Sequence, residues 1–217
     1  MLNAYVVAHV TINSTESRPY AAKGARPGYR LGRFLSSNGP LQMNKLKLQL
    51  MHREALRRLA DAEILSKAMP PEENSDSAYL LKLLGLELLL KIVFEAELNK
   101  PGGGHAYEKL FGELPPSLQT KLLALAGERV GPSALVENHE LVLQKWGKNF
   151  VDLRYPWESY EGLSEEQYLT LGEKWMSKDA PLEEAKFRYY PQELLGFLSA
   201  LRLVASEIVN SSDNAIT

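Results

Sequence analysis

The chain has 217 residues, no cysteine and a formal net charge of −2 at pH 7. The absence of cysteine excludes a disulfide framework, a thiolate metal site and a cysteine nucleophile, and it is typical of a reducing compartment. A mildly acidic chain does not offer a basic face for sequence-independent nucleic-acid binding over its whole surface. It leaves room for a local basic patch only.

Residues 1–17 lack the basic leader of a signal peptide, and His9 and Thr11 interrupt their short apolar run. The most apolar segment, residues 79–98, carries five charged side chains, which suits a buried core helix better than a bilayer span. We therefore expect a cytoplasmic protein with no membrane partner.

Residues 1–42 differ from the rest of the chain. They contain five basic residues against Glu16 alone, a net charge of +4, and only residues 4–12 could form a strand. A stretch rich in Gly, Arg, Pro and Ser predicts a disordered extension, or one that is not translated, since Met43 opens the first organised segment. The alternative is a basic arm that contacts RNA or an acidic partner. The basic residues are Arg18, Lys23, Arg26, Arg30 and Arg33.

From Asn44 onward the apolar residues recur at steps of three and four, which predicts helices. Two prolines at 70 and 71 end the first helix, and Ser75 or Ser77 can cap a second that runs to Leu98. The second helix is rich in leucine on nearly every side, so we place it at the centre of a bundle. Its one polar ridge consists of Glu87, Lys91 and Glu95.

Further helices are expected down to residue 210. Ser133 can cap a helix that reaches about Leu153, Ser164 opens a capping-box helix, and Pro191 suits the first residue of the last helix. The sequence thus predicts an all-α domain over residues 43–210, a bundle of four long helices plus two or three short ones, followed by a disordered tail at 211–217. The shorter helices are expected over residues 105–112 and 117–127.

Three segments resemble the HEPN superfamily, small helical-bundle proteins of prokaryotic defence and toxin systems. They are LLGLELLLKIVFEAEL at 83–98, GHAYEKLFGELP at 104–115 and WGKNFVDLRYPWE at 146–158. With the flanking helices, the resemblance spans residues 44–210. It implies a HEPN-like bundle that forms a homodimer, with a ligand groove between the subunits.

The chain departs from the pattern of active HEPN ribonucleases, in which an Arg precedes a His by four to six residues. Ser159, Tyr160 and Glu161 stand five, six and seven residues after Arg154. No other arginine has a histidine at that spacing. The metal-independent RNA cleavage of the family is therefore not carried over to this chain.

The most suggestive cluster is Arg154, Tyr155, Trp157 and Glu158. A guanidinium, two rings and a carboxylate at a helix end could bind a phosphate and a base. The alternative is structural, with Arg154 paired to Glu158 and the rings covering the end of the bundle. Lys148, with Lys145 and Asn149, could extend a small basic patch or lie in solvent as ordinary surface.

The four histidines show no metal-binding spacing, so we expect no metal and no cofactor. His105 follows three glycines; it could be a mobile acid–base group, or it could cap a short helix or pack against Tyr107. His139 lies on an apolar stripe with Trp146, which favours a partly buried residue.

Three hypotheses follow. The first is a HEPN-like domain that binds RNA or a nucleotide through Arg154, Tyr155 and Glu158, supported by Lys148 and His105. The second is an atypical metal-independent ribonuclease toxin that uses His105 or His139 with Arg154. The third is a non-catalytic interaction module, the partner of a protein encoded beside it. RNA cleavage, RNA binding and co-purification with that protein distinguish the three.

Overall fold

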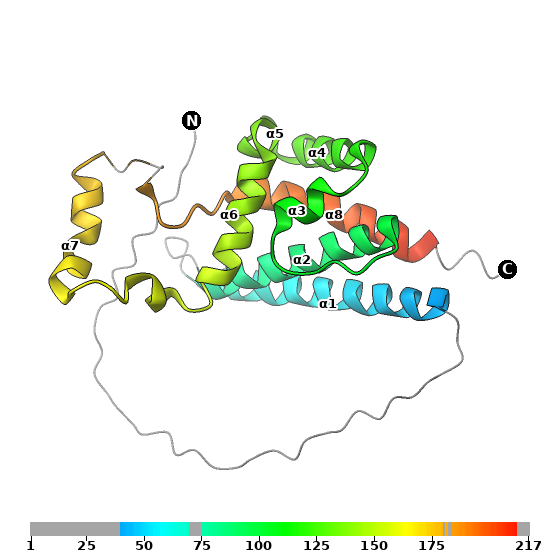
Figure 1. The fold of residues 1–217 in the computed structure, drawn as a ribbon, viewed down its shortest axis with the longest axis horizontal. Helices are drawn as coiled ribbons and strands as arrows, with labels where there is room; N and C mark the ends of the chain where they lie inside the picture. Colours follow the sequence, from blue (N-terminus) through cyan, green and yellow to red (C-terminus); the bar gives the residue numbers. More distant parts are fainter. Residues whose placement is uncertain (1–39, 70–74, 180, 182–183, 212–217) are drawn as a thin grey trace, which may run out of the picture.

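The computed structural model describes residues 40–69, 75–179, 181 and 184–211, with side chains from residue 45 onward. Every regular element in these ranges is a helix, so the predicted all-α class is confirmed (Figure 1). The strand expected over residues 4–12, nearly all of the basic extension and the tail lie outside the described residues. The helices are α1 Pro40–Ala68, α2 Asp76–Leu98, α3 Tyr107–Gly112, α4 Pro116–Val130, α5 Ala134–Glu137, α6 His139–Asp152, the 3-10 helix η1 Pro156–Tyr160, α7 Glu165–Met176 and α8 Pro191–Ser211.

Helix α2 lies at the centre, packed against α1 along its length and against α8 (Figure 1). Most of its apolar side chains are buried, as expected for a helix that is hydrophobic on nearly every side. The Ser75 hydroxyl accepts a hydrogen bond from the Ala78 amide at 3.2 Å, which confirms Ser75 as the cap. Asn99, in the left-handed region at φ 49°, ends the helix.

Helix α4 packs against α8 on the other side of the core. The contact is close because Gly196 has no side chain: a Cβ there would lie 2.9 Å from the Ala126 carbonyl oxygen. Pro191 is the first residue of α8, as the sequence predicted. Helix α4 runs three residues past the predicted end at Gly127.

The helix predicted over residues 133–153 is wrong in one respect, because the chain forms two helices there. Ser133 makes no side-chain capping bond, and α5 has only four residues. Asn138 instead caps α6, its side-chain oxygen accepting from the Leu141 amide at 3.0 Å. An asparagine side chain satisfies a free helix amide as well as a serine does, so it competes with an uninterrupted helix at that point.

Helix α8, not the α2 segment, is the one described helix that is long and apolar enough to cross a membrane. Its side chains toward α2 and α4 are buried, among them Phe197 and Leu201. A core helix of a bundle passes the same test of length and composition, so this feature is weak evidence for a span.

Helix α7 and η1 lie at the end of the molecule remote from the start of α1 (Figure 1). Neither element has a buried residue. The predicted capping box of α7 is confirmed: Ser164 accepts from the Gln167 amide at 3.2 Å, and the Gln167 side chain accepts from the Ser164 amide at 2.8 Å. Local sequence thus starts this helix without support from the core.

Candidate functional site

Glu87 is the polar centre of the site, and it is only 5% exposed within the central helix. Its carboxylate accepts from Lys91 Nζ at 2.7 Å, from His105 Nδ1 at 2.7 Å and from the Tyr107 hydroxyl at 3.2 Å. The Glu87–Lys91 pairing on the polar ridge was expected from their spacing. Three donors around one carboxylate satisfy the acceptor positions that burial would otherwise leave empty.

The loop that carries His105 is held against two helices. Glu95, two turns beyond Glu87 on α2, accepts from the Gly102 amide at 3.3 Å and pairs with Lys47 of α1. On the other side Gly147 of α6 lets the loop approach, since a Cβ there would collide with the His105 carbonyl oxygen. In this structure His105 thus contacts Glu87 of α2 and lies beside Gly147 of α6, while the hypothesis of a mobile acid–base group stays a prediction.

The Phe150 ring connects His105 to Arg154. Its centroid lies 5.0 Å from that of the His105 ring and 4.9 Å from the Arg154 guanidinium carbon. Burial raises the pKa of the Tyr107 hydroxyl above its ordinary value, the Glu87 carboxylate raises it further, and the Arg154 guanidinium acts in the opposite direction. Phe150 therefore contacts both His105 and Arg154.

A groove of about 550 Å³ opens beside this cluster. His105 lines it from the loop, and Lys145 and Lys148 line it from α6. The His105 side chain is 41% exposed and Lys148 is exposed, so a ligand in solvent can reach both. Within the described residues neither lysine is in an ion pair, whereas Glu108 lines the groove as its one carboxylate. The groove therefore has a positive balance of charge.

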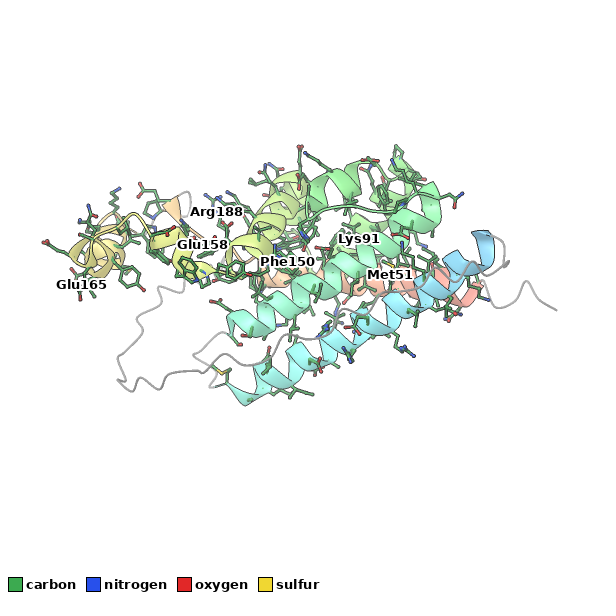
Figure 2. All side chains as sticks on the ribbon, turned by 60° about the horizontal axis from the view of Figure 1, so that its bottom comes forward. Met51, Lys91, Phe150, Glu158, Glu165 and Arg188 are labelled. Carbon is green, nitrogen blue, oxygen red and sulfur yellow. The ribbon has the colours of Figure 1, made fainter. Side chains whose placement is uncertain are left out.

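The predicted residues divide into two groups. Arg154, His105 and Lys148 come together around α6, and Arg154 is exposed, not sealed inside the bundle. Tyr155 directly precedes η1 and Glu158 lies within it; both are exposed, and neither lines the groove. Figure 2 shows Glu158 near the α7 end and Phe150 and Lys91 within the bundle.

Two expectations for Arg154 are not met. Among the described residues no carboxylate pairs with its guanidinium, so the structural alternative of an Arg154–Glu158 pair does not hold. His139 packs against Phe111 at the first residue of α6. It is separated from Arg154 by the length of that 14-residue helix, about 20 Å, and cannot act with it.

Sequence reasoning missed Tyr107, Phe150 and Gly147 as parts of the site. The sequence held one signal for Gly147, a glycine in the middle of an amphipathic helix, which often marks a close approach of another segment. The contacts of Glu87 with His105 and Tyr107 had no such signal, because these two residues come from a loop and a helix 18 and 20 residues away. Only the packing of α2, α3 and α6 brings these groups together.

The arrangement can hold a histidine in one tautomer. An ionised carboxylate only accepts, so His105 Nδ1 donates to Glu87, and a neutral ring then presents Nε2 as a proton acceptor. With three cations nearby, the same site can bind an anion. No group of three or more metal-ligating side chains exists among the described residues.

Comparisons of this chain with protein-family models, with curated proteins and with solved structures find no match. The resemblance to the HEPN superfamily, and the homodimer and cytoplasmic location expected with it, therefore stay predictions. The fold and the site define a helical bundle with a buried carboxylate–imidazole pair at the edge of a cationic groove.

Proposed function

We propose that this protein binds RNA or a nucleotide, with the phosphate held in the groove beside α6. The observation that carries the proposal is the contact chain from Glu87 through His105 and Phe150 to the exposed Arg154, in which His105 also lines the open groove. A guanidinium and lysine ammonium groups are donors that bind phosphate oxygens.

Salt-dependent RNA binding tests the proposal. A labelled single-stranded RNA is titrated with the full chain, and binding is followed by fluorescence anisotropy at several salt concentrations. We expect affinity to fall as salt rises, because cations that neutralise phosphates release counterions. Replacing Arg154 or Lys148 by alanine should weaken binding several-fold and reduce the salt slope by about one for each lost phosphate contact.

Lys67→Ala is the matched control, because it removes the same charge from an exposed position on α1. It should leave RNA affinity unchanged. Equal losses in the Lys148→Ala and Lys67→Ala variants would mean that only net charge matters, and the groove would then not be the site. Absence of binding to both RNA and nucleoside phosphates by wild-type protein would refute the proposal.

The Glu87–His105 pair favours a second candidate function, metal-independent cleavage of RNA. A neutral His105 could take the proton from a ribose 2′-hydroxyl as that oxygen attacks the adjacent phosphorus, while Arg154 stabilises the charge on the phosphate. The bond from phosphorus to the 5′ oxygen then breaks, and this oxygen takes a proton from solvent water, which gives a 2′,3′-cyclic phosphate and a 5′-hydroxyl. Tertiary packing here brings an arginine and a histidine into one cluster although their sequence spacing does not match the family pattern.

Incubation of total RNA with the protein in the presence of a chelator tests this second candidate. Cleavage that both His105→Ala and Arg154→Ala abolish supports it, with His139→Ala as the control that keeps activity. RNA that stays intact with wild-type protein rejects cleavage and leaves the binding proposal standing.

A further inference from the structure

A second concave region lies between η1 and α7, away from the cationic groove, and has a volume of about 560 Å³. Aromatic rings form much of its lining, and two of them are well exposed, Trp157 at 61% and Tyr168 at 41%. Three carboxylates also line it, Asp76 at the start of α2, Glu161 and Glu165. We call this the aromatic pocket; its rings are Trp157, Tyr160, Tyr168 and Phe187.

The aromatic pocket has the chemistry of a site for a basic side chain. Cations bind the faces of tryptophan and tyrosine rings, and Lys186 already lies over the Tyr160 ring, its Nζ 5.8 Å from the centroid. Tyr160 and Tyr168 meet edge to face at 5.2 Å, which fixes the angle between two of the walls. In the described part of the chain, neither Glu161 nor Glu165 is in an ion pair, so both carboxylates can receive a cation.

The charge of η1 and α7 indicates which kind of partner can bind at the aromatic pocket. Residues 156–179 contain six carboxylates and only two lysines. Residues 1–42 of the same chain have the opposite balance, with five basic residues against one acidic residue. The two segments therefore attract each other, and the N-terminal one supplies the arginine and lysine side chains for which an aromatic pocket is suited.

We propose that the aromatic pocket binds residues 18–26 of this same chain, with Arg18, Lys23 or Arg26 between the rings. The distance that the chain can span from Pro40 limits which N-terminal residues can enter the pocket, and residues 18–26 meet this limit. Helix α1 starts at the end of the molecule opposite α7, and its 29 residues span about 43 Å (Figure 1). The connection from Pro40 must cover at least that length.

An extended chain covers about 3.3 Å per residue. Arg26 lies 14 residues before Pro40 and reaches about 46 Å, and Arg18 reaches about 73 Å. Arg30 and Arg33 reach only about 33 and 23 Å, too short for the pocket of their own chain. The proposal thus separates two groups of basic residues within one segment.

Zero-length carbodiimide cross-linking of the full chain tests the proposal, because this reagent joins only an amine and a carboxylate that are in contact. We expect mass spectrometry of the monomer to show Lys23 joined to Glu161 or Glu165. Replacing Trp157 or Tyr168 by alanine should lower the yield at least five-fold. Leu169→Ala is the matched control, since Leu169 is 68% exposed on the same helix and does not line the pocket.

Several results would overturn the inference. One is a wild-type chain in which Lys23 links to remote carboxylates such as Glu97 and Glu128 as often as to Glu161 and Glu165, or forms no link. Another is a mixture of isotopically heavy and light chains that yields mixed links, because a second copy would then supply the segment. Trypsin provides an independent measurement: cleavage after Lys23, which Gly24 follows, should be several-fold slower in wild type than in Trp157→Ala, and equal rates would contradict the contact.

Discussion

The two concave regions of this protein are built in opposite ways. The groove beside α6 has its polar groups fixed by the core: Glu87 is 5% exposed, and the His105 loop is held by hydrogen bonds to α2 and by close contact with α6. The aromatic pocket is lined largely by η1 and the start of α7, which have no buried residue, and meets the core through Asp76 and the buried Leu153. Its rings are ordered by neighbouring rings and by a local helix cap.

The comparison shows what a buried polar group and an exposed aromatic ring can each contribute to binding. A buried carboxylate can fix one tautomer of a histidine because water does not compete for the hydrogen bonds. Exposed rings cannot provide such control, but they present large apolar faces to an incoming side chain at little cost in conformational entropy. We therefore expect substitutions in the buried contacts behind the groove, at Glu87 and Gly147, to change stability strongly, and substitutions at the aromatic pocket to change binding with little effect on stability.

The largest effect is expected when the buried pair is broken. Glu87→Ala removes the partner of Lys91, His105 and Tyr107, and loss of one member of a buried pair typically costs about 3–5 kcal/mol in the free energy of unfolding. Glu63 and Lys67 form a pair of the same spacing on the exposed face of α1, so Glu63→Ala is the control and should cause no measurable change. Urea unfolding of both variants measures the contrast; similar values would mean that Glu87 is not buried as described.

A smaller loss is expected for Gly147→Ala. The added methyl group collides with the His105 carbonyl oxygen, and overpacking of this kind costs about 1–3 kcal/mol in the free energy of unfolding. Gly127→Ala is the control, because a Cβ there meets only Val136 at an ordinary 3.7 Å and should stabilise α4 by up to about 1 kcal/mol. Thermal unfolding of the two variants should therefore shift in opposite directions.

The buried hydroxyl of Tyr107 predicts how the free energy of unfolding changes at alkaline pH. Burial, and next the Glu87 carboxylate, raise the pKa of the Tyr107 hydroxyl in the folded protein. The stabilisation that this raised pKa reflects is therefore complete below pH 10.0, the ordinary pKa of tyrosine, and is lost as the pH rises above that value. The free energy of unfolding should fall by up to about 1.4 kcal/mol per pH unit for this group. Tyr107→Phe should show a shallower fall in denaturation measured between pH 9 and 11, and parallel curves would contradict the burial of the hydroxyl.

The smallest effect is expected on α7. Leu169 is 68% exposed, so Leu169→Ala should change the free energy of unfolding by less than about 0.5 kcal/mol. Leu90, fully buried on α2, provides the contrast, since its replacement by alanine should cost about 2–5 kcal/mol. A large loss at Leu169 would show that α7 is covered by a further partner.

Much of the helical plan could be predicted from local sequence. Three helices start at residues that local sequence identifies: Ser75, the capping box at Ser164, and Pro191. The groups that start each of these helices lie within four residues of one another, so their positions can be predicted from the sequence alone. The error near Ser133 has the same origin, because Ser133 and Asn138 are both good caps and the choice between them depends on how α5 meets α4 and α6. Local patterns do not rank two competing caps.

For the candidate site, the sequence by itself determined which chemical groups are present: Arg154, His105 and Lys148, and Glu87 on a leucine-rich helix. Only the tertiary structure decided their grouping, placing His105 against Glu87 and Arg154 against Phe150 while leaving Tyr155 and Glu158 outside. The physical reason is that helix periodicity fixes neighbours three and four residues apart, whereas contacts across 18 or more residues depend on how closely the helices pack. In this protein Gly147 permits that close approach.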